Sequence, residues 1–378
     1  MILRIENLQE ACKDILAAVD SNELSTVTET LELVTKENFL FINVTNREYF
    51  AQVKIDIGEV IDFHATVNAN LFLKLISQLT TDTVELNSKP GENFITVKAN
   101  GTYKIPLIFD GDKLLELPQI DIVNVTNEMN VPSSVLKSIL MYNSKQLTMG
   151  TISKPVQRLF YVDEKGAITF TNGACVNSFT LEKPVKLLFN SRLVKLFKLF
   201  NDENVKFTLG YDSISDDIIQ TKVRFESSNI VLTAILSCDD KLLSVFPVNT
   251  IRARASTEYP YSVNIHKDNM LQTINRLLLF NSTAGSSKEV IKPYSTFVFD
   301  KDSVVIYDVN KENKETINYN NTVINCTEPY KAILDLTELK VTLESCTEQY
   351  LNIHFGDGTA FVITRGHIAN VVPECRLS

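Results

Sequence analysis

The chain has 378 residues, of which 44% are hydrophobic and 22% charged, and its formal net charge is −9. This length exceeds what one compact core supports and predicts two or three domains. The acidic balance argues against a protein that coats nucleic acid through bulk charge, although positive charge gathered on one face stays compatible with it. No apolar run reaches the ~18–20 residues of a membrane span. The six cysteines form no CxxC pair, which is typical of a reducing compartment, and we expect a cytoplasmic protein.

A unit of one strand, one amphipathic helix and two or three further strands recurs along the chain. Residues 1–6 predict a strand, and residues 8–20 place Leu8, Cys12 and Ile15 on one helical face. Three more strands are predicted at 30–37, 39–46 and 49–57. The second unit has a strand at 61–68, a helix at 68–79, and strands at 83–90, 93–100 and 102–110.

The other four units follow the same order, with helices predicted at 133–145, 190–201, 267–281 and 335–345. Two segments without the pattern, 111–130 and 242–256, are interpreted as connectors. The sequence thus predicts an α+β fold of three similar domains, at 1–120, 121–250 and 251–378. Helices of about 12 residues are not stable alone and must pack on a sheet, which leaves their other face exposed.

The exposed helix faces carry a modest positive bias. The second to fifth helices have a net positive formal charge, whereas the first and the last are net negative. Helices that face DNA need Lys and Arg side chains directed at the phosphates. The candidates on the helices are Lys74, Lys137, Lys145, Arg192, Lys195, Lys198, Lys267 and Arg276, and Lys154 and Arg158, which follow the third helix, are included with them. On charge alone, ordinary solvated helix faces explain this pattern better.

Residue patterns typical of enzymes are weak. The histidines are scattered and have no Cys, His or carboxylate at ligand spacing; they are His64, His266, His354 and His367. Gly356-Asp357-Gly358 lies between two strands, and we interpret it as a hairpin turn and not a phosphate loop. The acidic pairs at 216–217 and 239–240 lie in polar loops, as solvated turn residues do. We therefore predict no catalytic, metal or cofactor site.

Six copies of the unit, paired into three domains of about 120 residues, resemble the bacterial DNA polymerase sliding clamp, the beta subunit. Three short motifs add to the resemblance: the tail NVVPECRLS, the segment TFTNGACVN, and Phe246-Pro247 at the second connector. Ala174-Cys175-Val176 departs from a His-Arg-Leu type of sequence, the tail proline lies one place early, and Ser378 follows the final Leu. These departures are typical of a divergent member of the family, such as a phage-encoded one.

The resemblance implies the DNA clamp fold, with helices lining a ring and sheets outside, and a head-to-tail homodimer that closes the ring. Such a ring encircles duplex DNA without reading its sequence and tethers the replicative DNA polymerase, so it is a processivity factor and not an enzyme. The implied dimer interface joins Ile105 and Leu107 to Leu279 and Phe280. Leu279 and Phe280 are equally well explained as ordinary core.

The resemblance also implies that the DNA polymerase and the clamp loader dock through short peptides in an apolar pocket between the second and third domains. Its residues are Thr171, Gly173, Ala174, Cys175, Val176, Phe246, Pro247, Ile251, Val371, Val372, Pro373, Glu374, Cys375 and Arg376. Without the resemblance, Val371 and Val372 are better explained as a terminal strand. Two other functions stay open: a structural or assembly ring protein without DNA, and a hydrolase or nuclease.

Overall fold

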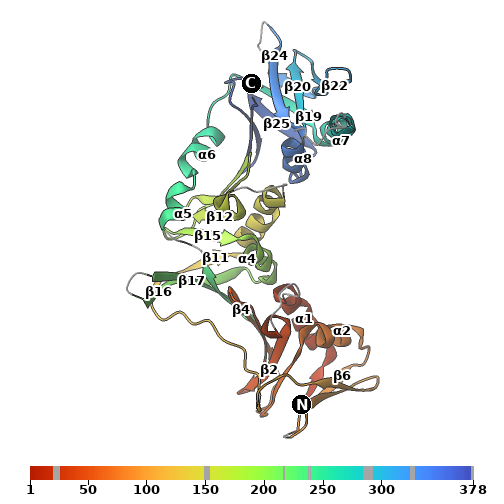
Figure 1. Ribbon diagram of the computed structural model, residues 1–378, viewed down its shortest axis with the longest axis vertical. Coiled ribbons are helices and arrows are strands. Elements are labelled where there is room, and N and C mark those ends of the chain that lie inside the picture. The colour runs from red at the N-terminus through yellow and green to blue at the C-terminus, as the bar shows by residue number, and fades with distance from the viewer. Residues whose placement is uncertain are drawn as a thin grey trace. The chain divides into compact units, whose positions relative to one another are not determined.

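The computed structural model describes residues 1–19, 26–89, 91–148, 154–215, 218–236, 238, 240–283, 293–323 and 328–375 (Figure 1). Its contacts divide the chain into two compact units. Unit 1 consists of Met1–Leu136 and Lys195–Ser237, and unit 2 consists of Lys137–Val194 and Cys238–Ser378. None of the helices in the described ranges is long and apolar enough to span a membrane.

Unit 1 is built on two sheets. The smaller has the order β1 (Ile2–Arg4), β6 (Thr83–Asn87), β7 (Phe94–Lys98) and β8 (Thr102–Pro106). The larger has the order β11 (Val125–Pro132), β16 (Asn204–Ser215), β17 (Ile218–Glu226), β18 (Ile230–Leu236), β4 (Tyr49–Asp56), β3 (Phe39–Thr45), β2 (Thr30–Lys36) and β5 (His64–Asn68). Strands β9 (Phe109–Asp110) and β10 (Lys113–Leu114) form a further two-stranded sheet.

Two helices of unit 1, α1 (Ile5–Ile15) and α2 (Ala69–Gln78), pack side by side (Figure 1). The buried face of α1 is formed by Ile5, Leu8, Ala11, Cys12 and Ile15. The α2 helix begins at Asn68, whose side chain accepts a hydrogen bond from the backbone N–H of Leu71 at 2.9 Å. This bond satisfies one of the N–H groups that a helix start leaves without an internal partner.

Unit 2 also holds two sheets. The larger has the order β15 (Lys186–Asn190), β12 (Leu159–Asp163), β13 (Gly166–Phe170), β14 (Ala174–Ser178), β27 (Ile368–Pro373), β26 (Ala360–Arg365), β25 (Tyr350–Phe355), β19 (Tyr261–His266) and β23 (Asn321–Val323). The smaller has the order β22 (Lys314–Asn318), β21 (Ser303–Tyr307), β20 (Tyr294–Phe299) and β24 (Tyr330–Asp335). Helices α7 (Lys267–Thr283) and α8 (Leu336–Glu344) pack together beside them.

The two middle helices are not regular α-helices along their whole predicted length. The third consists of α3 (Ser133–Ser138), a π turn (Ile139–Asn143) and a 3-10 turn (Ser144–Thr148). The fourth consists of α4 (Ser191–Lys195) and a 3-10 turn (Leu196–Leu199). In the π turn the buried Asn143 side chain donates hydrogen bonds to the backbone carbonyls of Ala167 on β13 and Cys175 on β14.

Strand pairing follows one rule throughout the described chain. The strand before each helix pairs with the first of the three strands that follow the neighbouring helix, as β1 does with β6 and β5 with β2. Four of the six third strands pair antiparallel with each other, β4 with β18 and β14 with β27. The remaining third strands, β8 and β22, form edges of their sheets. The two compact units do not correspond to the three predicted domains. The predicted domain boundaries at 120 and 250 therefore stay predictions.

Both predicted connectors contain regular structure. Strand β11 begins at Val125, within the first connector. The second connector folds into α5 (Asp240–Val245) and α6 (Val248–Ala255). Helix α6 buries only Ile251 of its own residues, so it lacks the apolar periodicity from which the other helices are predicted.

Candidate protein-binding and DNA-facing surfaces

Strands β14 and β27 pair in unit 2, and we call this strand pair the seam. Its two faces carry different side chains. Ala174 pairs with Val371, Cys175 with Asn370 and Val176 with Ala369. Side chains alternate between the faces of a sheet. Ala174, Val176 and Val371 therefore share one face, and Cys175 and Asn370 share the other.

The first face of the seam belongs to an apolar cluster, which we call the Phe246 cluster. Its buried members are Val156, Leu159, Tyr161, Ile168, Ala174, Val176, Leu188, Phe246, Ile251, Ala360, Val362 and Val371. The Phe246 ring stacks on Tyr161, with 5.2 Å between centroids, and meets Phe170 edge-on at 5.0 Å. Half-buried apolar side chains, including Leu242, Leu243 and Val248, pack against it, so apolar surface extends from the cluster toward solvent.

Two arginines anchor α6 beside this cluster. Arg252 donates to both carboxylate oxygens of Asp163, at 2.6 and 2.7 Å. Burial raises the pKa of Asp163, but the hydrogen bonds from Arg252 outweigh it and hold this pKa below its usual value. Arg254 binds Asp357 at 2.9 Å and the Thr359 hydroxyl at 2.6 Å. The bidentate pair orients α6 because both groups are planar.

The structure brings five of the predicted pocket residues together in the Phe246 cluster: Ala174, Val176, Phe246, Ile251 and Val371. Cys175 and Val372 do not join them. Cys175 is fully buried on the opposite face of the seam, and Val372 packs in a second core with Leu339 and Leu343 of α8. Because alternate residues of a strand point oppositely, these two side chains offer no surface to a peptide.

The other predicted pocket residues border the cluster or lie beyond it. Pro247 is the half-buried residue before α6, and Pro373 ends β27. Glu374 accepts a hydrogen bond from the Tyr330 hydroxyl at 2.8 Å, and Cys375 N–H donates to the carbonyl of Ile333 at 2.8 Å. The tail is therefore bound to β24 as far as residue 375. Arg376 lies outside the described residues.

The opposite face of the seam meets a layer of buried polar side chains. Asn143, Asn177 and Asn370 are fully buried there, and Asn177 donates to Asn143 Oδ1 at 3.2 Å. Glu338, on α8, is also fully buried. Its Oε1 accepts a hydrogen bond from Gln146 Nε2 at 2.5 Å, and its carboxyl group accepts one from the Gly173 backbone N–H. Sequence reasoning missed this residue, because a Glu in the first helical turn has the pattern of an exposed helix charge.

The predicted DNA-facing residues divide into three groups. Exposed side chains belong to Lys74, Lys137, Lys145, Lys154, Arg158, Lys195 and Lys198. Arg192 and Lys267 are half-buried, and the Lys267 ammonium donates to the carbonyl of Cys346 at 3.1 Å. Arg276 is held by two hydrogen bonds to the Glu315 carboxylate of β22. The Arg276 side chain is 53% exposed, and ion pairs this open to solvent are weak, so Arg276 stays a candidate phosphate ligand.

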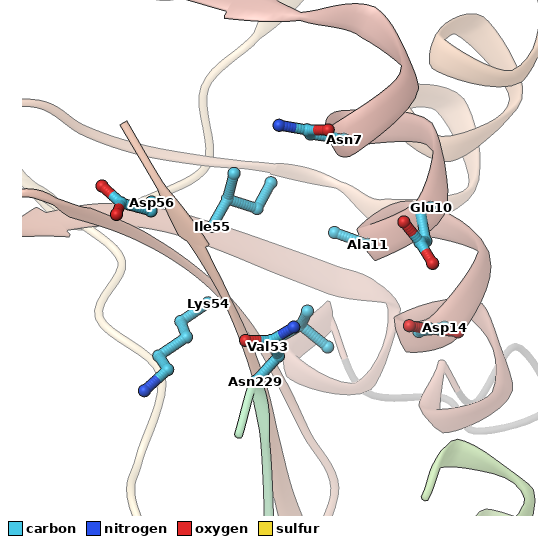
Figure 2. Close-up of a pocket in the computed structure, with 9 residues that line it drawn as sticks. All are labelled: Asn7, Glu10, Ala11, Asp14, Val53, Lys54, Ile55, Asp56 and Asn229. Carbon is cyan, nitrogen blue, oxygen red and sulfur yellow. The ribbon is translucent and has the colours of Figure 1, made fainter. Parts of the chain in front are cut away.

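Among the described residues of unit 1, α1 borders two cavities. One, of about 320 Å³, lies between α1 and β4, and Figure 2 shows Glu10 and Asp14 on the helix facing the strand that carries Lys54 and Asp56. Burial, and then the charge of Glu10, raise the pKa of Asp14. The other, of about 420 Å³, is lined by residues of α1 and α2 that include Lys13 and Lys74. The carboxylates of the first cavity repel phosphate groups, whereas the two lysines of the second cavity attract them.

The predicted dimer-interface residues differ in exposure. Ile105 is only 2% exposed and pairs with Ile95 in the sheet, so its side chain belongs to the core of unit 1. Leu107 is half-buried beside Val67. Leu279 and Phe280 on α7 are 64% and 48% exposed. An apolar surface of this kind on a helix is typical of a protein contact.

The histidines have structural partners. His64 Nε2 lies 3.0 Å from Glu32 Oε1, and His354 Nε2 lies 3.0 Å from the Thr364 hydroxyl. Asp357 caps its own hairpin and binds Arg254. Among the described residues, no group of three His, Cys, Asp or Glu side chains has the arrangement of a metal site. Residues 216, 217 and 239 lie outside the described ranges.

No family model matches the sequence. Over 141 residues, 37% of this chain, it is 28% identical to the beta sliding clamp of Mycoplasmopsis pulmonis (strain UAB CTIP), and the match spans 36% of that relative. The whole chain superposes on 99% of the DNA polymerase sliding clamp from Bacillus subtilis, with 14% identity and a TM-score of 0.75.

Two further solved structures superpose on this chain to a similar extent. The beta subunit from the DNA polymerase of Streptococcus pyogenes gives 14% identity and a TM-score of 0.78, and the sliding clamp from Pseudomonas aeruginosa bound to griselimycin gives 11% and 0.77. Each covers 100% of this chain and 99% of the other. The chain therefore has the fold of bacterial sliding clamps.

Proposed function

We propose that this chain is a DNA sliding clamp, a ring of two copies that encircles duplex DNA and tethers the replicative DNA polymerase. The observation that carries the proposal is the superposition of the whole chain on bacterial clamps at TM-scores of 0.73 to 0.78. Its action is topological and makes or breaks no bond, so the protein is not an enzyme. A replication role places it in the cytoplasm, and the three domains at 1–120, 121–250 and 251–378 belong to the same proposal.

The pairing rule of the strands supports a head-to-tail dimer. Four of the six third strands pair with each other inside the chain, and β8 and β22 are the two left at sheet edges. Pairing β8 of one copy with β22 of the other would repeat the same joint twice and leave neither edge open. The exposed Leu279 and Phe280 lie on α7, which packs against β22.

Introducing charge at this helix is expected to separate the two copies. The Leu279→Asp/Phe280→Asp double variant places two carboxylates in an apolar contact, which costs several kcal/mol when they are desolvated. Light scattering after size exclusion at micromolar concentration should give the mass of a dimer for the wild type and 42.6 kDa for the variant. Val60→Asp, at a side chain that is 82% exposed elsewhere, should stay dimeric. A wild-type monomer would count against the ring.

The topological mechanism predicts a dependence on DNA form. The protein, assembled on nicked circular plasmid with a bacterial clamp loader, should co-elute with the DNA in gel filtration at 0.2 M salt and dissociate when a restriction enzyme linearises the plasmid. Lys and Arg contacts to phosphates are sequence-independent and weaken steeply with salt, so they do not hold the protein without the ring. Equal retention on circular and linear DNA would contradict encirclement and favour the structural or assembly protein.

The Phe246 cluster is the proposed docking site for peptides of the polymerase and the clamp loader. It combines buried aromatic anchors with half-buried apolar side chains at its border, as peptide-binding surfaces do. Burial of one or two apolar anchors contributes about 1.5–3 kcal/mol each, which suits exchangeable partners. We further propose that griselimycin, the ligand of the Pseudomonas aeruginosa clamp, binds at this cluster.

A further inference from the structure

Glu338 lies against Gly173, the residue before Ala174 of the Phe246 cluster. It occupies the first turn of α8, where its backbone N–H is capped by Asp335, and its side chain is fully buried. One carboxylate oxygen accepts from Gln146, and the carboxyl group also accepts from the Gly173 N–H. The second oxygen, Oε2, has no hydrogen-bond partner among the described residues. The carboxyl group therefore links α8 to the turn at Gly173.

That turn, residues 171–174, joins β13 to β14 and leads into the seam. Thr171 N–H donates to the carbonyl of Gly173 at 2.8 Å, and Gln157 donates to the carbonyl of Thr171 at 2.7 Å. A Cβ at position 173 would collide with Glu338 Oε1 and with the carbonyl oxygen of Val371, 2.8 Å away. Glycine is therefore required for this close approach. Ala174, the next residue, lies in the Phe246 cluster.

The charges around Glu338 come from α8 itself and from three elements packed on it. On α8, Lys340 is half-buried and Glu344 exposed. The neighbouring elements carry Lys145 on the 3-10 turn Ser144–Thr148, Tyr330, Lys331 and Asp335 on β24, and Lys267, Asp268 and Arg276 on α7, whereas β27 carries no ionisable residue. Burial, helped by the charge of Asp335, outweighs the two hydrogen bonds and raises the pKa of Glu338 to about 7. Both forms of the carboxyl group are thus populated near neutral pH.

We propose that Glu338 is a positioning residue for the partner peptide: its ionised carboxylate fixes the turn at Gly173, and its protonation loosens that turn and weakens peptide binding. This inference rests on the proposed docking of peptides at the Phe246 cluster. A hydrogen bond to a carboxylate is roughly twice as strong as one to a neutral acceptor. Protonation of Glu338 therefore weakens the bond from Gly173, and the peptide must then order the turn as it binds.

A tryptophan reporter tests the link between Glu338 and the turn without any ligand. The chain has no tryptophan, so Phe170→Trp, at the end of β13, places a single indole beside the turn. Its emission is expected to change between pH 6 and pH 8 with a midpoint near 7. The change should vanish in Phe170→Trp/Glu338→Gln, which keeps an acceptor oxygen but does not titrate, and persist in Phe170→Trp/Glu344→Gln. Emission that is independent of pH, or that still titrates when Glu338 is replaced by glutamine, overturns the inference.

Calorimetry with griselimycin tests the consequence for binding in the native chain. The wild type is expected to bind about fivefold more weakly at pH 6 than at pH 8, the Glu338→Gln variant equally at both, and the Glu344→Gln variant like the wild type. A merely structural role of Glu338 would lower affinity without changing the pH profile. Binding that does not depend on pH in the wild type overturns the positioning role. Failure to bind griselimycin at any pH contradicts the proposed peptide site instead, and the tryptophan reporter then decides the role of Glu338.

Discussion

Replacement of Phe246 by alanine is expected to lower the free energy of unfolding of unit 2 by about 3–5 kcal/mol, the usual cost of removing a buried aromatic ring. Phe246 is 5% exposed, and its ring contacts both Tyr161 and Phe170. The same change should abolish griselimycin binding, because it removes the centre of the proposed docking cluster. Urea denaturation followed by circular dichroism measures the first effect, and calorimetry below the unfolding transition measures the second.

Val245→Ala is the matched control for this variant. Val245 is the neighbouring residue at the end of α5 and is 57% exposed. Truncation of an exposed side chain changes stability by at most about 0.5 kcal/mol, so this variant should unfold and bind like the wild type. A Phe246→Ala protein that is destabilised but still binds griselimycin with native affinity would show that the peptide site lies elsewhere.

The Glu338→Gln variant is expected to be more stable than the wild type at pH 8, by up to about 3 kcal/mol, and equally stable below about pH 4. The folded protein raises the pKa of Glu338 from 4.5 to about 7, so between these values it binds a proton that the unfolded chain has released. The stabilisation is complete below pH 4.5 and is lost as the pH rises through 7. Glutamine does not ionise, so the variant does not lose it.

Hydrogen exchange of the β14 and β27 amides at several pH values measures this difference within unit 2. The exposed Glu344 on the same helix supplies the control, since Glu344→Gln should shift stability equally little at every pH. A Glu338→Gln variant that is less stable than the wild type at pH 8 would mean that the ionised carboxylate stabilises the fold, against the direction of the pKa.

The helices and most strands were predictable because the repeated unit follows local periodicity. Each of the six predicted helices corresponds to one in the structure, and the strands at 39–46 and 49–57 agree with β3 and β4 within a residue. Helices α5 and α6 were not predictable, because their short sequences carry no clear apolar stripe and α6 is held by the distant pair between Arg252 and Asp163.

The candidate site was predictable only in part. The Phe-Pro pair and the tail motif located Phe246 and Val371, which the structure brings into one cluster. The register of β14 against β27 decides which residues of those motifs face the cluster, and this pairing joins segments almost 200 residues apart. Cys175 and Val372 were therefore assigned to the wrong face. The burial of Glu338 depends on Gln146 and Gly173, which are also far away in sequence.

The two long sheets have a consequence for cooperativity. Strands β11, β16, β17 and β18 are hydrogen-bonded into the sheet of β2 to β5, while β12 to β15 belong to the sheet of β25 to β27. Elements that share a sheet tend to open together. The middle predicted domain is therefore divided between two cooperative units. The three predicted domains should unfold as two units, which separate at residues 136–137 and 194–195.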